Sequence, residues 1–487
     1  MNNKVWGIHW FRRDLRIPGN NSLRWNWKKS NRKVIGIFCF DSRFLSRSDF
    51  SHHRFAFFID TLIELKSEMQ KQGGDLLVVD DLPHLAFDKI FTFLREKKIS
   101  LPKFVSWGRD YEPFAILRDQ KVKSLMENWG IEVHTERDHL LIEPWEFKRS
   151  DGKGSFYQVY TPYSKQWFAK LNTPEIRARI ESHSTFEHYV IRLENNNLEK
   201  IFELNWDTLL KQQDFPYQDS LLKFYEENKK HVRIKIPTAG TKEAFKQLNK
   251  FKAKIENYNV ERDFPSCDGT SKLSIFQKNG SIVSSQIIYF FNLQNQFTKE
   301  IVWREFFYSV MYHRPENEKK SFIAKYENIK WENNKSWFQR WKEGVTGFPI
   351  IDAGMRQLRD TGWTHNRVRM IVASFLTKDL LIDWRWGEQY FMNELIDGDL
   401  APNNGGWQWA ASTGCDPQPY FRVFNPWLQS EKFDHEGNYI KKYVKELRDA
   451  PIAALHDPDF DRSPWKYPKP MVEHKIQKNK AIMLFKN

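Results

Sequence analysis

With 487 residues the chain is longer than one ordinary domain, so we expect two or three folded units and enough chain to enclose a large cofactor. Its 76 Lys and Arg outnumber its 62 Asp and Glu and leave a net charge of +14, which makes a polyanion the first partner to test, although a merely basic soluble surface gives the same total. The three cysteines stand alone, so neither a disulfide framework nor a zinc site is indicated, and a reducing cytoplasm fits best. Arginines follow a short apolar run at the start and no stretch approaches ~18 uncharged apolar residues, so we expect neither a signal peptide nor a membrane span.

The first 140 residues alternate short β-rich runs with amphipathic helical stretches, which predicts an α/β domain with a Rossmann-like, doubly wound parallel sheet. After the first run stands RIPGNN instead of a GxGxxG motif, so the usual dinucleotide fingerprint is absent. The predicted strands lie at 4–11, 34–40, 75–80, 104–108 and 131–135, and the predicted helices at 53–70, 84–98 and 116–130.

Residues 141–235 are expected to connect this domain to the next, because the segment from 180 onward is polar, irregular in period and interrupted by Pro216. Over 236–487 the apolar residues recur at helical spacing almost throughout, which predicts an all-α domain. More than half of the 20 Trp residues lie in this second domain, and so many indoles exceed what core packing usually requires.

Three segments of the second domain contain groups that suit the binding of a ligand, and each segment also has a plainer structural explanation. In RDFPSCDGTSKLS, 262–274, hydroxyls surround a lysine ahead of a helical pattern, which suits a phosphate or ordinary helix capping. In KEIVWREFFYSVMYHRP, 299–315, a carboxylate, an indole and a guanidinium share one helical face, which suits an uncharged base edge or a salt-bridged amphipathic helix. In GWTHNRVRM, 362–370, an amide and a thioether share a face beside two arginines, which suits a base bracketed by phosphates or a half-buried helix.

The segment LIDGDLAPNNGGWQWAAS, 395–412, places two aspartates around a glycine, ahead of Asn403 and a bend that the paired glycines make flexible. A metal site is disfavoured because no third carboxylate or histidine lies at ligand spacing, so the carboxylates are expected to bind hydroxyls or to pair with Arg369. Trp407 and Trp409 follow. These and other tryptophans are too many for stacking on single-stranded nucleic acid alone, and several are expected to be core.

Together these segments resemble the photolyase and cryptochrome flavoproteins, and most closely the class I cyclobutane pyrimidine dimer (CPD) DNA photolyases. The resemblance implies an α/β antenna-binding domain at 1–140 and a helical, FAD-binding catalytic domain at 236–487. The segments that carry it occur in the family's order and spacing: YNVERDFPSCDGTSKLS, EIVWREF, TGFPIIDAGMRQLRDTGWTHNRVRM, DGDLAPNNGGWQWAASTGCDPQPYFRVFNP and EKFDHEGNYI.

The resemblance implies that FAD, active as FADH⁻, binds in the helical domain, with its phosphates at the hydroxyl run and its ribityl chain and ring at the two aspartates. Arg369 is the expected partner of Asp397. Asn403 is expected to face flavin N5, where an amide favours the reduced flavin and therefore repair over signalling. The expected cofactor-binding residues are Tyr258, Thr270, Ser271, Lys272, Leu273, Ser274, Arg369, Asp397, Gly398, Asp399 and Asn403.

The resemblance also implies a pocket for a dimer flipped out of DNA, and photolyases are themselves a standard case of enzymes that take a base out of the stack. Blue or near-ultraviolet light would drive an electron from the flavin to the dimer, so neither a metal nor proton transfer is required. Glu300 and Asn366 would bind the thymine edges, and the indoles would pack its faces. The expected catalytic residues are Glu300, Trp303, Asn366, Met370, Asn403 and Trp409.

Three tryptophans match, from the flavin to the surface, the family's electron relay: Trp407, Trp384 and Trp331. The DNA surface is expected to include Arg262, Arg304, Arg367 and Arg422, which would bind phosphates whatever the base sequence. The expected partner is UV-damaged DNA, single- or double-stranded, bound by a monomer away from any membrane. The expected location is the cytoplasm of a bacterial-type cell, with the protein on the nucleoid through its DNA.

Two departures from the family pattern stand out. Phe297 occupies a position where relatives often have Trp beside the flavin, and is expected to form an apolar wall. Phe114 and Ala115 replace the Asn-Glu pair of folate-binding relatives, which leaves open whether the second chromophore is methenyltetrahydrofolate, a deazaflavin or absent.

Two other functions stay open beside light-driven repair. A cryptochrome-like signalling flavoprotein would need a partner-binding tail, for which the C-terminal MVEHKIQKNKAIMLFKN offers little room. A flavin-free single-strand binder is disfavoured by Asp397 and Asp399.

Overall fold

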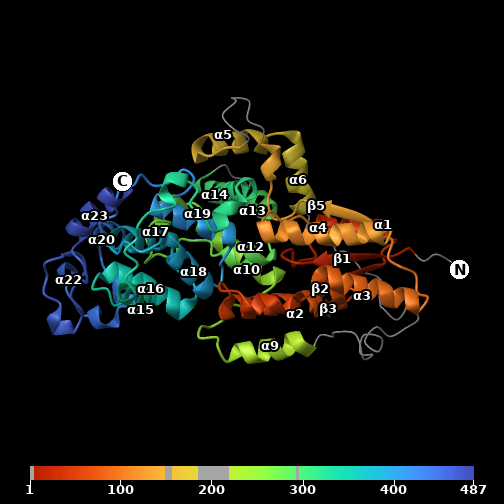
Figure 1. Ribbon diagram of the computed structural model, residues 1–487, viewed down its shortest axis with the longest axis horizontal. Coiled ribbons are helices and arrows are strands. Elements are labelled where there is room, and N and C mark those ends of the chain that lie inside the picture. Colours follow the sequence, from red (N-terminus) through yellow and green to blue (C-terminus); the bar gives the residue numbers. More distant parts are fainter. Residues whose placement is uncertain (1–4, 148–155, 185–218, 292–294, 487) are drawn as a thin grey trace.

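The computed structural model describes residues 5–147, 156–184, 219–291 and 295–486, which form an α/β domain and a helical domain lying end to end (Figure 1). The α/β domain carries the N-terminus and the helical domain the C-terminus. Most of the polar segment at 180–235, including Pro216, lies outside the described residues.

The first domain is built on a five-stranded parallel sheet in the order β3-β2-β1-β4-β5. The four strands other than β5 are buried along their whole length because helices cover both faces, whereas β5 forms a partly exposed edge. The sequence predicted all five strands. They are β1 Gly7–Phe11, β2 Val34–Cys39, β3 Leu76–Val79, β4 Phe104–Gly108 and β5 Glu132–Glu136.

Successive side chains of β1 point to opposite faces of this sheet. Ile8 and Trp10 pack with α3 and α4, whereas Phe11 packs with α2 on the other face. Since the strand order reverses between β1 and β4, the carboxyl ends of these strands border a crevice of the kind in which doubly wound folds bind ligands. The helices are α1 Asn21–Lys29, α2 His52–Lys71, α3 Pro83–Glu96 and α4 Pro113–Asn128.

The described helices that lie between the two domains in the sequence pack on one or the other of them (Figure 1). Helix α5, Tyr160–Leu171, packs on α14 of the helical domain, and α6, Pro174–Ser184, packs on α13. Helix α9, Asp219–Lys229, returns to the first domain and packs on α2.

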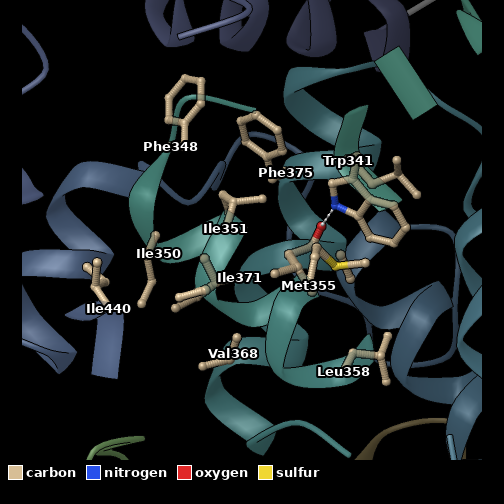
Figure 2. Close-up of a cluster of buried hydrophobic side chains, with 14 of the residues drawn as sticks. Trp341, Phe348, Ile350, Ile351, Met355, Leu358, Val368, Ile371, Phe375 and Ile440 are labelled. Atoms are coloured by element: carbon tan, nitrogen blue, oxygen red, sulfur yellow. Dashed lines mark hydrogen bonds between the residues drawn. The ribbon is translucent and has the colours of Figure 1, made fainter. Parts of the chain in front are cut away.

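The second domain is helical, as predicted, and Figure 2 shows part of its core, where Trp341 lies among apolar side chains of α16 and α17. None of the described helices is long and apolar enough to span a membrane. The main helices are α10 Thr241–Lys252, α11 Tyr258–Glu261, α12 Ser274–Asn279, α13 Ser284–Phe291, α14 Gln296–His313, α15 Lys335–Glu343, α16 Pro349–Thr361, α17 Asn366–Ser374, α18 Trp384–Glu394, α19 Leu400–Ala411, α20 Pro426–Phe433, α21 Asn438–Tyr443, α22 Ile452–His456 and α23 His474–Lys486.

The glycine-flexible bend predicted after Asn403 was wrong, because this stretch lies inside α19. Gly405 serves helix packing instead of a turn: a Cβ atom there would lie 2.1 Å from the ring of Phe307 on α14. Gly405 therefore allows α19 and α14 to approach closely.

Candidate functional site

Asp397 joins three segments of the helical domain. Arg369 on α17 donates to both of its carboxylate oxygens, at 3.0 and 3.1 Å, and the hydroxyl of Ser274 donates to it at 2.7 Å. The predicted Arg369–Asp397 pair is thus present, and only 7% of Asp397 is exposed. This ion pair fixes the start of α12 relative to α17.

The hydroxyl run, Thr270 to Ser274, leads directly into α12. Leu273 occupies the N-cap position, and no side chain caps the helix there, so helix capping does not account for the run. Lys272 adopts a left-handed backbone conformation, with φ 53°, and pairs with Asp268 at 2.6 Å. Hydroxyls, free helical N–H groups and an ammonium group in one place are a donor set suited to phosphate.

Asp399 lies at the interface between the two domains. Its carboxylate receives Arg13 of the α/β domain at 3.1 Å and the hydroxyl of Tyr308 at 2.7 Å. Lys278 and Arg304 complete the cluster, at 3.2 and 3.3 Å. Although burial alone would raise it, the pKa of Asp399 is held well below its ordinary value by these cations, Arg13 above all.

Asn403 lies on α19, one turn after Asp399. Its amide nitrogen donates to the backbone carbonyl of Glu388 on α18 at 3.1 Å. Burial raises the pKa of the Glu388 carboxyl to about 7, against the opposing effect of a hydrogen bond from Asn403. Sequence reasoning did not single out Glu388, because a lone glutamate on a helix carries no local signal.

The helical form of α19 separates its two indoles. Residues two apart on an α-helix point about 200° from each other. Trp407 accordingly points into the core, where its ring centroid lies 5.1 Å from that of Phe391 and 6.2 Å from that of Trp341. Trp409 is half-buried on the other side, near Phe424 at 6.5 Å.

The acid predicted for the lesion pocket, Glu300, is paired with a residue predicted for the DNA surface. Arg262 donates to Oε1 of Glu300 at 2.5 Å, and Gln296 donates to the same oxygen at 2.9 Å. Within the described residues, Oε2 has no hydrogen-bond partner. One carboxylate oxygen of Glu300 is thus available to a ligand.

The other residues predicted for the lesion pocket come from three elements. Trp303 on α14 stacks on Tyr160, at the start of α5. Asn366 is exposed at the first position of α17, and Met370 lies one turn later, half-buried beside Arg367. No hydrogen bond between described residues joins Asn366 to Glu300, and the two lie on different helices, α17 and α14.

The first two predicted relay tryptophans are buried, and the last one is partly exposed. Trp407 is 3% and Trp384 is 0% exposed, whereas Trp331 is only half-buried. Gly387, one turn after Trp384 on α18, lies against Trp407, since a Cβ atom there would be 2.2 Å from the indole.

Two backbone hydrogen bonds bring the Trp331 segment next to Trp384. The N–H of Glu332 donates to the carbonyl of Leu381 at 2.8 Å, and the N–H of Asp383 donates to the side chain of Asn333 at 2.8 Å. The three indoles therefore lie on neighbouring segments that run from the core to the surface.

The four arginines predicted for the DNA surface have different environments. Arg422 is exposed, and Arg367 is held by Asp263 at 2.7 Å over the ring of Phe433. Arg304 differs from these, because its side chain is only 12% exposed and binds Asp399. Its contacts place Arg304 in the interdomain cluster around Asp399.

A cavity of about 490 Å³ lies at the carboxyl ends of β1, β2 and β4, where the α/β domain meets the helical domain. Phe114 and Ala115 line it from the α/β domain, and Lys278, Met392 and the predicted cofactor residue Gly398 line it from the helical domain. Arg12 and Arg118 lie over the ring of Trp10, at 4.6 and 5.1 Å from its centroid. The remaining aromatic lining is Phe38, Phe40, Phe44, Phe55 and Phe58. Apolar walls beside several guanidinium groups suit a planar aromatic ligand with an anionic group.

The donor set of the helical domain fits FAD. The hydroxyls and Lys272 suit a diphosphate, and the buried Asp397 and Asp399 lie where hydroxyls of a ribityl chain could donate. Around Gly406, on the same helix as Asn403, no atom lies within 4 Å of the position a Cβ would take. In the described part of the chain, no group of three or more His, Cys, Asp or Glu could hold a metal ion.

Known families match both domains. The family model described as DNA photolyase matches residues 7–181, and the one described as FAD binding domain of DNA photolyase matches residues 297–487. A deoxyribodipyrimidine photo-lyase from Alkalihalophilus pseudofirmus is 34% identical over 98% of this chain and 97% of its own length.

Solved structures agree with these matches. An archaeal photolyase from Sulfolobus tokodaii, described with two FAD molecules and a novel light-harvesting cofactor, is 32% identical with a TM-score of 0.76, over 99% of this chain and all of its own. A bacterial class III photolyase from Agrobacterium tumefaciens is 30% identical with a TM-score of 0.79, over 100% of this chain and 98% of its own.

Proposed function

This chain belongs to the DNA photolyase family, and from that premise we propose how its residues carry out light-driven DNA repair. The protein is a deoxyribodipyrimidine photo-lyase, a carbon–carbon lyase that binds FAD and acts on UV-damaged DNA. The observation that carries the assignment of its site is the Ser274–Asp397–Arg369 network beside the hydroxyl run.

In the helical domain, the run from Thr270 to Ser274 would hold the FAD phosphates, and Asp397 and Asp399 the ribityl hydroxyls. When bound, reduced FAD absorbs blue or near-ultraviolet light and supplies the electron that splits the cyclobutane ring. The chain's part is to hold this cofactor, to exclude water and to place the dimer. Asn403, anchored by Glu388, would present its amide to the ring.

We propose that the lesion pocket is formed by Glu300, Trp303, Asn366, Met370 and Trp409. Oε2 of Glu300 would accept a hydrogen bond from a thymine N–H, while Arg262 keeps Oε1 occupied. The amide of Asn366 would meet the second base. Trp303 and Trp409 supply apolar faces, and a damaged base is less costly to unstack than a paired one.

The DNA would run over Arg262, Arg367 and Arg422, whose phosphate contacts position any sequence, single- or double-stranded. We further propose that the enzyme works as a monomer in the cytoplasm, on the nucleoid. Trp407, Trp384 and Trp331 would return the flavin to its reduced state by passing electrons inward from the surface.

For the cavity at the carboxyl ends of the strands we propose a second, light-harvesting chromophore with a flavin or deazaflavin ring. The aromatic lining and the arginines over Trp10 support it, as does Phe114 in place of the polar pair of folate-binding relatives. The absorption spectrum of the material released on denaturation would identify the ring, and a folate spectrum would contradict this choice.

The repair function is tested with an oligonucleotide that contains one thymine dimer. Purified, chemically reduced protein should split the dimer under blue light and leave it intact in the dark. Dimers that persist after illumination of protein with a full complement of FAD would overturn the function.

A further inference from the structure

The indole of Trp303, a predicted wall of the lesion pocket, has one face covered by another residue of the chain. The ring of Tyr160 lies parallel to it, with 3.6 Å between the centroids and 4° between the planes. Phe306 meets both rings edge-on, at 5.7 and 5.8 Å. Phe307 also lies near the indole, with 5.6 Å between the centroids and 34° between the planes. Tyr160 covers one face of Trp303, so the opposite face is the one proposed to meet a base.

Tyr160 is itself tied to both sides of the pocket. Its hydroxyl donates to the carbonyl of Lys299, on the same helix as Trp303, at 3.0 Å. Its backbone N–H donates to the carboxylate of Asp416 at 3.0 Å, in the segment that follows Trp409. Beside it, the thiol of Cys415 donates to the carbonyl of Gln158 at 2.9 Å.

The segment 158–160 also lies at the surface. Val159 is 46% exposed and Gln158 is exposed, while Tyr160 is half-buried between them and α14. A part of the chain between the two domains thus reaches the edge of the site, although its sequence gives no sign of a role there.

We propose that Tyr160 is a positioning residue of the lesion pocket. Its ring holds the indole of Trp303 so that the opposite face of the indole receives the dimer, and its backbone fixes the distance between Trp303 and the segment after Trp409. This inference rests on the proposed pocket, since Tyr160 acts through Trp303. Stacking restricts the rotation of the indole before the substrate arrives, so less conformational entropy is lost on binding.

The anchoring of α5 makes the inference testable, because it does not depend on Tyr160 alone. The indole N–H of Trp167, two turns further along α5, donates to the buried carboxylate of Glu305 at 2.7 Å. The helix is therefore expected to stay in place when the ring of Tyr160 is removed.

The test compares the affinities of three variants for a dimer-containing and an undamaged oligonucleotide. Tyr160→Ala should weaken dimer binding about 3- to 10-fold, the range typical of an aromatic pair, with no change for undamaged DNA or in FAD content. Tyr160→Phe keeps the stack and should bind dimers within about 2-fold of the parent protein. Tyr157→Ala is the matched control, since Tyr157 packs on Phe147 and Tyr163 instead.

A double-substitution cycle separates positioning from a general structural effect. In a Trp303→Ala background the change at Tyr160 should cost nothing more, because the side chain acts through Trp303 and the backbone bond to Asp416 is kept in Tyr160→Ala. An equal loss in both backgrounds, an equal loss for undamaged DNA, or no loss at all would overturn the inference.

If Tyr160→Ala lowers the melting temperature strongly, Tyr160→Leu, which keeps the bulk without the aromatic face, replaces it and should weaken dimer binding in the same way. A parent protein with no preference for dimers would refute the proposed function instead.

Discussion

Arg262 and Glu300 meet through a single carboxylate oxygen, with Nη1 2.5 Å from Oε1. Gln296 donates to the same oxygen, so the arginine and the amide hold the carboxylate in place while Oε2 stays available in the described structure. The pair connects the proposed phosphate contacts of the DNA surface to the proposed lesion pocket.

Replacing Glu300 with Ala should therefore affect the lesion and not DNA in general. We expect dimer affinity to fall about 10- to 100-fold, the effect of losing a hydrogen bond to a charged group. Affinity for undamaged DNA should stay the same or rise, because Arg262 is freed for phosphate. Fluorescence anisotropy with both oligonucleotides measures this, and a parallel loss for the two would contradict the assignment.

Trp407→Phe should abolish photoreduction of the flavin while leaving repair intact once the cofactor is reduced chemically. Phenylalanine fills most of the space but is far harder to oxidise than an indole. Trp341→Phe is the control, because Trp341 also lies against Trp407 but is outside the predicted relay. Absorption spectra before and after illumination report the result, and loss of repair in reduced Trp407→Phe would show that this residue is needed for more than electron relay.

His365 should make stability depend on pH. It is 2% exposed, and burial lowers its pKa to about 4 from an ordinary value near 6.5. Its Nδ1 accepts the N–H of Arg367 at 3.2 Å and so caps α17 in the neutral form. Between about pH 6.5 and 4 the unfolded chain binds a proton that the folded protein does not, so the free energy of unfolding decreases as the pH falls, by at most about 3 kcal/mol.

The variant His365→Asn isolates this effect, because asparagine caps helices well and does not titrate. Its melting temperature should decrease less than that of the parent protein between pH 6.5 and 5. His53 and His183, whose pKa values burial lowers to about 4 and about 3, act in the same direction and leave a residual slope. Identical slopes in the two proteins would exclude His365 as a contributor.

Arg13→Ala should loosen the contact between the domains. The side chains of Arg13 and Asp399 are only 11% and 9% exposed, so the loss leaves a buried carboxylate with fewer partners. Because two other cations remain, we expect the free energy of unfolding to decrease by about 1–3 kcal/mol, with weaker retention of FAD. Arg43→Ala, which breaks an exposed pair with Asp41, should cost less than about 1 kcal/mol. Thermal unfolding of the two variants gives the comparison.

Periodicity predicted the elements of this fold well where one pattern governs a whole segment. All five strands follow from short β-rich runs, and α14 from its helical spacing. The sequence pattern did not predict that α19 continues through its glycines, because paired glycines usually destabilise a helix. The packing of Gly405 on Phe307 offsets this loss of stability, and it is a long-range contact that the local sequence does not show.

The site was predictable only where its residues come from distinctive motifs. The Arg369–Asp397 pair is present as the resemblance implied. Tyr160 and Arg13 could not be predicted, because each reaches the site from a distant segment and long-range contacts leave no mark on local spacing. The pairing of Arg304 with Asp399 could not be predicted either, because charge alone does not show which carboxylate an arginine meets.

Because α19 is a continuous helix, a change in its length would disturb more contacts than the replacement of one of its side chains. Each residue turns an α-helix by about 100°, so inserting or deleting one residue between Asn403 and Trp407 would rotate both indoles away from their present sides. Single substitutions disturb one contact, whereas a change of length disturbs every contact that follows it. We therefore expect an insertion or deletion in this segment to disturb both indoles at once, which no single substitution does.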